Sequence, residues 1–182
     1  MARLVQQLAA VVILAISAVG CATTMTASSH VRDGFDVARY RTYDWGPADA
    51  LPTGDARLDK DPYFQDQLQG AVEKQLALRG IVLSASGTPD LLIHYHANID
   101  TRIDVNRSER EYGYCQGTDC ESWVVEYEVG TLVLDIIDAR TNQLLWRGWA
   151  QDSVADELGN EDRMAQTINE AVTRILARFP LP

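Results

Sequence analysis

The sequence has little positive charge: 16 Lys and Arg residues stand against 26 Asp and Glu residues, and the formal net charge is −10 at pH 7. Proteins that bind nucleic acid neutralise phosphates with Lys and Arg, so a surface of this sign repels polyanions on average. The composition therefore argues against nucleic acid as a partner. It is otherwise typical of a soluble globule, because 46% of the residues are hydrophobic and 23% are charged.

A long hydrophobic run is also absent. After Arg3, the apolar stretch from Leu8 to Val19 contains twelve residues. As a helix it would measure about 18 Å, whereas the hydrocarbon core of a bilayer is about 30 Å thick. The stretch is therefore too short to span a membrane. With the small residues that follow it, the stretch has the layout of a secretory signal peptide, and we expect residues 1–20 to be removed.

The junction Gly20-Cys21 resembles the lipobox of bacterial lipoproteins, whose Cys receives a diacylglyceryl group and becomes the new N-terminus. The resemblance implies lipidation at Cys21 and anchorage to a bacterial membrane through acyl chains. Ala18 stands where Leu is usual, so cleavage by ordinary signal peptidase near Ala22 is the alternative. Because Ala22 is not the Asp that resembles an inner-membrane retention signal, we expect the outer membrane, with the protein facing the periplasm.

The rest of the chain has the length of one domain. We expect a lipidated flexible tether over residues 21–34, which are rich in Thr and Ser, and a single α+β domain over residues 35–182. Hairpin order predicts a mostly antiparallel sheet of four or five strands with two helices packed on one face. A change of phase near Gly130 suggests a bulge. The predicted strands are 40–45, 81–83, 90–106, 123–138 and 144–149, and the predicted helices are 62–79 and 160–178.

Four segments follow one another behind the leader. They are Tyr40-Arg41-Thr42-Tyr43-Asp44-Trp45, Pro89-Asp90-Leu91-Leu92-Ile93, Gly130-Thr131-Leu132-Val133-Leu134-Asp135 and Leu145-Trp146-Arg147-Gly148. In this combination and order they resemble the bacterial envelope lipoproteins of the domain of unknown function 4136 family. The resemblance covers nearly the whole mature chain and supports the predicted fold and location. It implies no catalytic residue, because the family has no settled activity.

Two cysteines, Cys115 and Cys120, flank a glycine between two predicted strands, and the glycine allows a tight turn. In an oxidising compartment we expect them to form a disulfide, which would close a short loop and add about 2 kcal/mol to stability. The alternatives are free thiols, or a zinc site with His94 and His96. The 19 residues from His96 to Cys115 would span about 60 Å as strand. We therefore expect no metal and no cofactor.

The polar side of the alternation that begins at Asp90 carries His94, His96, Asp100 and Asp104, and the odd-numbered apolar residues share the other side. We expect both imidazoles to lie in water, and these four residues to form a surface for interaction instead of a catalytic or zinc centre. The four tryptophans of the sequence could stack on sugars, although tryptophans in strands usually pack in the core or across strands.

The sequence contains no motif of a serine hydrolase, zinc protease, phosphate-binding loop or dinucleotide site, and it predicts no catalytic residue. We expect a non-enzymatic envelope lipoprotein that binds another envelope component, a protein or a glycan, through its sheet face or the hairpin around residues 107–121. One alternative is a hydrolase-like enzyme acting on cell-wall or lipid material, which a pocket joining His94 or His96 to an acidic residue would favour. The other is a small-ligand carrier, which an open apolar cavity between helices and sheet would favour.

Overall fold

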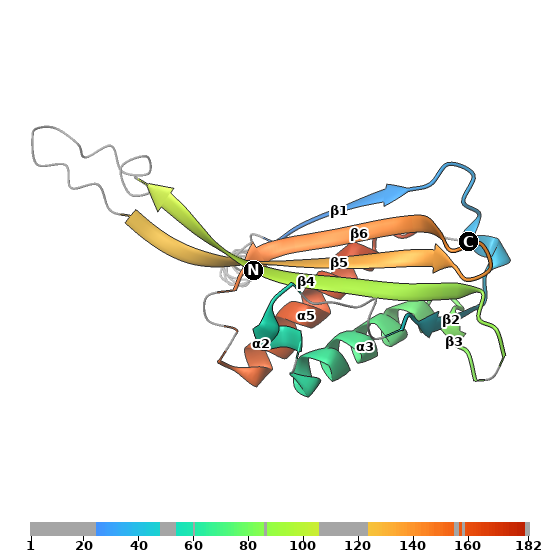
Figure 1. Ribbon diagram of the computed structural model, residues 1–182, viewed down its shortest axis with the longest axis horizontal. Coiled ribbons are helices and arrows are strands. Elements are labelled where there is room, and N and C mark those ends of the chain that lie inside the picture. Colours follow the sequence, from blue (N-terminus) through green and yellow to red (C-terminus); the bar gives the residue numbers. More distant parts are fainter. Residues whose placement is uncertain are drawn as a thin grey trace, which may run out of the picture.

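Six strands of the computed structural model form one mixed sheet in the order β1-β6-β5-β4-β2-β3 (Figure 1). The structure describes residues 25–47, 54–59, 61–85, 87–105, 124–154, 157 and 159–180. Helices α3 and α5 pack together on one face of the sheet, which confirms the predicted α+β class. The elements are β1 (Thr26–Val31), the 3-10 helix η1 (Val37–Arg39), β2 (Thr42–Trp45), α2 (Ala56–Asp59), α3 (Pro62–Ala77), β3 (Val82–Leu83), β4 (Leu91–Val105), β5 (Val124–Asp138), β6 (Gln143–Ser153) and α5 (Glu161–Leu176).

The sheet differs from the sequence prediction in its strand directions. Strand β2 pairs in parallel with both β3 and β4, because the chain crosses from β2 to β3 through α3 on the helical face. The prediction of a mostly antiparallel sheet with four or five strands is therefore wrong. Strands β4, β5 and β6 do form the antiparallel series that hairpin order indicates.

The sixth strand, β1, lies where the sequence predicted a flexible tether. It pairs antiparallel with β6, with Thr26 opposite Gln151. The tether prediction is therefore wrong over Thr26–Val31. The polar composition of this segment did not indicate a strand. An edge strand pairs its backbone with only one neighbour and can keep polar side chains, and β1 contains no fully buried side chain.

The core lies between the helices and the sheet face formed by the odd-numbered residues of β4. Leu91, Ile93, Tyr95 and Ala97 are buried there, as the alternation predicts. Ile103 was expected on the same buried face, but it is 60% exposed. The reason is that β4 and β5 continue past the helices as a two-stranded ribbon (Figure 1).

Both long helices begin after a residue whose side chain caps the first turn. The carboxylate of Asp61 accepts hydrogen bonds from the backbone N–H groups of Tyr63 and Phe64 at the start of α3. The side chain of Asn160 accepts from the N–H of Arg163 at the start of α5. Each helix buries one stripe of side chains. The stripes are Phe64, Leu68, Ala71, Val72 and Leu76 on α3, and Met164, Ile168, Ala171, Val172, Ile175 and Leu176 on α5.

The bulge predicted at Gly130 lies elsewhere. Strand β5 pairs with β4 in unbroken register through Gly130, and the irregularity falls between Ile136 and Ile137 opposite β6. Gly130 instead makes room for Val154, because an added Cβ would lie 2.8 Å from Cγ1 of that valine.

Some predicted features lie outside the described residues. These are the lipidation site Cys21, the disulfide pair Cys115 and Cys120 with the hairpin around it, and the side chain of Asp104. Within the described part of the chain, no helix is long and apolar enough to cross a membrane.

Candidate functional site on the helix-free sheet face

The side of the sheet opposite α3 and α5, here called the helix-free face, carries a cluster of polar and aromatic side chains. Side chains alternate between the two faces of a strand, and Ile93, Ile136 and Trp146 point into the core. Their sequence neighbours therefore lie on the helix-free face. The members of this helix-free cluster are His94 and His96 of β4, Asp135 of β5, and Arg147 and Trp149 of β6.

Asp135 and Arg147 form the shortest contact of the cluster. They lie opposite each other on β5 and β6, and Nε and Nη2 of Arg147 donate to different carboxylate oxygens of Asp135, each at 2.6 Å. The carboxylate is buried, with Asp135 only 4% exposed. These hydrogen bonds raise the pKa of Arg147 above its ordinary value. The planar fork of an arginine thus satisfies both oxygens of a buried carboxylate in a fixed geometry.

His96 lies beside this ion pair and faces solvent, as predicted. Its Nε2 is 3.9 Å from Oδ2 of Asp135, beyond hydrogen-bond distance, and its side chain is 40% exposed. A catalytic carboxylate orients its histidine through a short hydrogen bond. Asp135 does not orient His96 in this way, because Arg147 engages both carboxylate oxygens.

His94 differs from the prediction that both imidazoles lie in water. Gly46 follows β2 and packs on the His94 ring so closely that an added Cβ would overlap it. The N–H of Gly46 donates to the carbonyl of Ile93 at 2.9 Å, which holds this segment against β4. The Nε2 atom of His94 is buried without a hydrogen-bond partner among the described residues, and burial lowers the pKa of His94. This ring is therefore a covered part of the helix-free face.

A hollow of about 270 Å³ adjoins His96. Asn98 lies on the same face, and its Nδ2 donates to Oδ1 of Asp100 at 2.8 Å, which fixes the orientation of the amide. Asp100 is exposed, as predicted. The hollow thus presents imidazole, amide and hydroxyl groups side by side. Its lining residues are Gly54, His96, Ala97, Asn98, Thr131 and Val133.

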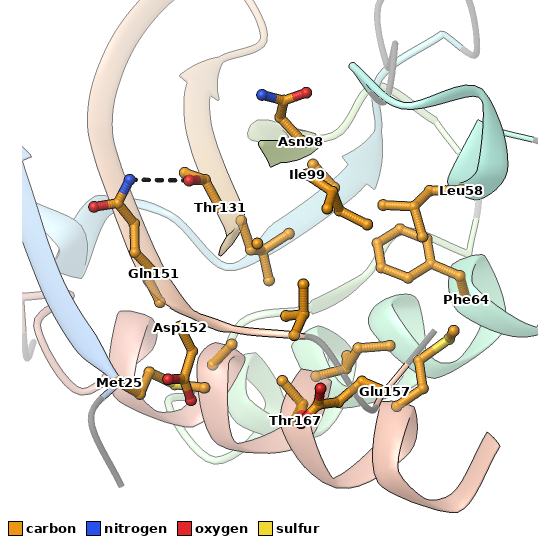
Figure 2. A pocket seen from close by; sticks show the side chains of 18 residues that line it. Met25, Leu58, Phe64, Asn98, Ile99, Thr131, Gln151, Asp152, Glu157 and Thr167 are labelled. Atoms are coloured by element: carbon orange, nitrogen blue, oxygen red, sulfur yellow. Dashed lines mark hydrogen bonds between the residues drawn. The ribbon is translucent and has the colours of Figure 1, made fainter. Parts of the chain in front are cut away.

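A second cavity, of about 80 Å³, lies between the sheet and the helices (Figure 2). It is the kind of apolar cavity that would favour a small-ligand carrier. Polar side chains near it include Gln151, whose Nε2 donates to Oγ1 of Thr131 at 2.9 Å. Its apolar lining consists of Met25, Leu58, Phe64, Ala97, Ile99, Leu132, Ala150, Val154, Met164, Ile168 and Ala171.

Sequence reasoning placed His94, His96 and Asp100 on one face but missed Asp135 and Arg147. A signal for them was present. Asp135 interrupts an apolar run in one predicted strand, and Arg147 interrupts the next strand at a similar distance from the turn between them. Hairpin pairing places these two strands side by side, and the register shift between Ile136 and Ile137 sets Arg147 opposite Asp135. Within the described residues, no three His, Cys, Asp or Glu side chains converge as metal ligands do.

The segments that carry the family resemblance contact one another in the fold. Asp90 of the second segment accepts hydrogen bonds at Oδ2 from the backbone N–H groups of Arg41 at 2.9 Å and Thr42 at 3.0 Å, both in the first segment. The Asp135–Arg147 pair joins the third segment to the fourth. These contacts give the four segments a shared structural role, because they fix neighbouring strands to one another.

The fold defines a class of α+β domains in which two helices cover one face of a mixed sheet. The chain belongs to the family described as Domain of unknown function (DUF4136), whose model matches residues 27–181. A DUF4136 family protein from Bacteroides thetaiotaomicron has 9% identity and a TM-score of 0.49, with 84% of this chain and 96% of that one covered.

Two further solved structures are similar in fold. A PDZ domain protein from Parabacteroides distasonis has 13% identity and a TM-score of 0.50, and the match covers 87% of this chain but only 37% of that chain. The PelC dodecamer from Paraburkholderia phytofirmans has 9% identity and a TM-score of 0.49, with 87% of this chain and 99% of that one covered. No curated protein matches the sequence. At these identities the likeness concerns the fold alone.

Proposed function

We propose that this protein is a non-enzymatic lipoprotein of the bacterial cell envelope that binds another envelope component through its helix-free face. The proposed anchor is a lipid on Cys21 in the outer membrane, facing the periplasm, and its support is the signal-peptide pattern with the Gly20-Cys21 junction. The observation that carries the binding proposal is the helix-free cluster. It places charged, imidazole and indole groups on a sheet face that none of the described helices covers.

The chemistry of this face favours a glycan as the bound component. Trp149 is partly exposed, and an indole face can stack on a sugar ring. The His96 side chain is 40% exposed and that of Arg147 is 47% exposed, so both can hydrogen-bond to hydroxyl groups. The adjoining hollow of about 270 Å³ offers room for a sugar-sized group. The net charge of −10 favours a neutral glycan over an anionic one.

The hydrolase alternative has less support from the geometry. It needs a histidine oriented by a carboxylate and positioned beside a nucleophile. Asp135 is engaged by Arg147, and the His94 ring is covered by Gly46. The hydroxyl of Thr131, which lines the hollow, accepts a hydrogen bond from Gln151. The exposed groups of this face are therefore better suited to binding than to catalysis.

Site-specific photo-crosslinking in the cell tests this proposal. A photoreactive amino acid replaces Asn98, which lines the hollow, in the full chain. The matched control carries it at Lys74, an exposed position of α3 on the other side of the sheet. We expect a glycan-containing adduct from position 98 and none from position 74. Equal adducts from both positions, or an adduct from position 74 alone, would contradict the proposal.

A second arm examines the stacking role of Trp149. Trp149→Ala removes the aromatic surface, so we expect the adduct from position 98 to fall at least about fivefold, as the loss of roughly 1 kcal/mol of contact energy implies. Trp149→Phe keeps an aromatic ring and should retain most of the adduct. Unchanged yield in the alanine variant would remove Trp149 from the binding surface.

A further inference from the structure

We propose that the hollow beside His96 recognises the acetamido group of an N-acetylated amino sugar. This assignment rests on the proposed glycan binding and deepens it, because it names the kind of sugar that the helix-free face accepts. An acetamido group differs from the hydroxyl of a plain hexose in three ways. It adds a methyl group, an N–H donor and a carbonyl acceptor on one substituent.

An apolar side chain lies at the centre of this face. Val133 of β5 is directly opposite His96 of β4 and Trp149 of β6, so the three side chains form one row across the strands. Val133 lines the hollow and is only partly buried. A methyl group in the hollow can therefore pack on Val133 while its sugar ring stacks on the indole of the neighbouring strand, roughly 5 Å away. A hydroxyl group gains nothing from this apolar surface.

The amide of Asn98 presents a hydrogen-bond acceptor at the same hollow. A carboxylate only accepts hydrogen bonds, so the contact of 2.8 Å with Oδ1 of Asp100 identifies the donor as Nδ2 of Asn98 and leaves Oδ1 of the amide as the acceptor. Gly54 lies beside that oxygen, and an added Cβ would be 2.9 Å from it. The glycine thus leaves next to the oxygen the space that a side chain would fill. In this space Oδ1 can accept a hydrogen bond from the N–H of an acetamido group.

Thr131 supplies the complementary donor. It lies opposite Asn98 on β5 and lines the hollow. Its Oγ1 accepts a hydrogen bond from Nε2 of Gln151 at 2.9 Å (Figure 2), which leaves the O–H of the threonine to donate. This hydroxyl can donate to the carbonyl of the acetamido group whose N–H binds Asn98. An acceptor, a donor and an apolar surface therefore match the three parts of one substituent.

The size of the hollow and the indole beside it favour a sugar as the carrier of this amide. The hollow of about 270 Å³ is smaller than the roughly 300–1,000 Å³ of pockets that enclose drug-sized ligands, so it takes one sugar unit. A peptide bond offers the same donor and acceptor, but it has no ring to stack on Trp149. An N-acetylated sugar also stays neutral, which suits a chain of net charge −10 better than an anionic sugar does.

Titrations of the full chain with two trisaccharides test this assignment. Tri-N-acetylchitotriose and cellotriose share one backbone of β-linked glucose units and differ only in whether each unit carries an acetamido group in place of a hydroxyl. Methyl NMR with 13C-labelled valine and threonine follows their binding through the signals of Val133 and Thr131, which line the hollow. We expect the acetylated probe to bind about tenfold more tightly, because burial of one methyl group contributes about fourfold and one hydrogen bond a few-fold more.

Two variants each remove one part of the match. Gly54→Ala places a methyl group beside Oδ1 of Asn98 and should lower the preference for the acetylated probe to about threefold or less. Its control is Gly70→Ala, where an added Cβ meets nothing within 4 Å. Val133→Thr replaces a methyl group of the apolar surface with a hydroxyl and should also lower the preference to about threefold. Its control is Val82→Thr on the edge strand β3, where the valine is 51% exposed. Both controls should keep the full preference.

Each contrary result has a distinct meaning. Equal binding of the two trisaccharides overturns the acetamido assignment and leaves the proposed glycan binding intact. N-acetylalanine methylamide carries the same amide without a sugar, and equally tight binding of this probe would identify a site for peptide amides instead. An unchanged preference in the folded Gly54→Ala and Val133→Thr variants also overturns the assignment. If neither trisaccharide binds saturably, the assignment fails, and the adduct from position 98 reports separately on the proposed function, because stacking on Trp149 does not need the Asn98 oxygen.

Discussion

Replacing Arg147 with methionine perturbs the central contact of the helix-free cluster. Methionine keeps an unbranched side chain but removes both donors, so the Asp135 carboxylate, 4% exposed, loses its two hydrogen bonds of 2.6 Å. Removing one partner of a fully buried ion pair costs about 3–5 kcal/mol. The Arg147 side chain is itself 47% exposed, so water can reach the vacated carboxylate. We therefore expect a smaller loss of stability, about 2–3 kcal/mol.

Urea unfolding followed by circular dichroism measures this loss. In a domain of this size the expected loss corresponds to a fall in Tm of roughly 4–12 °C. Arg140→Met is the matched control, because Arg140 is 71% exposed and its Nη2 lies 4.0 Å from Oδ2 of Asp138. A surface substitution of this kind should change the free energy of unfolding by no more than about 0.5 kcal/mol.

The double variant Arg147→Met with Asp135→Asn separates the ion pair from other effects. It removes the buried charge together with its partner, so we expect it to be more stable than Arg147→Met alone by about 1 kcal/mol or more. A loss below about 1 kcal/mol for Arg147→Met, or a double variant no more stable than the single one, would refute the reasoning that this buried carboxylate depends on Arg147.

Three other outcomes are expected. Gly148→Ala should lower the free energy of unfolding in urea by about 1–3 kcal/mol, because its Cβ would overlap the Trp146 indole; full stability would contradict this. The hydrogen bond from the backbone N–H of Arg41 is the main cause of the lowered pKa of Asp90. The Asp90 carboxylate therefore stabilises the fold at pH values above the ordinary Asp pKa. This stability is lost as the pH falls through the lowered pKa of the folded state. Asp90→Asn should therefore weaken the dependence of the free energy of unfolding on pH in the acid range, and an unchanged pH dependence would contradict this expectation. Cys21→Ser should lose its lipid mass and leave the membrane fraction; a variant that stays bound with unchanged mass would place the anchor elsewhere.

Strand β4 shows how far periodicity could predict this fold. Its alternation from Leu91 to Ala97 correctly predicts which side chains enter the core under the helices, because a strand with one covered face must bury every second side chain. The same rule fails at Ile103, where the helices no longer cover the sheet. Periodicity thus predicts which side chains share a face, but not how far the covering layer extends.

Contacts between distant segments account for the other failures. The burial of His94 depends on Gly46, which the chain brings back along β4 from the end of β2. The parallel pairing of β2 depends on the path of α3 across the sheet. No local pattern in Thr42–Trp45 specifies that path. The Asp135–Arg147 pair depends on the register shift between Ile136 and Ile137, because an unbroken hairpin register would set Trp146 opposite Asp135.

Strand β1 shortens the linker between the proposed anchor and the domain. The sequence predicted a tether up to residue 34, but β1 begins at Thr26, so four residues separate it from Cys21. They reach at most about 14 Å when extended. Met25 lines the apolar cavity, and its carbonyl accepts a hydrogen bond at 2.9 Å from Nη1 of Arg174 on α5. Lipidation of Cys21, as proposed, would therefore hold this cavity close to the membrane surface, while the helix-free cluster lies across the sheet from it.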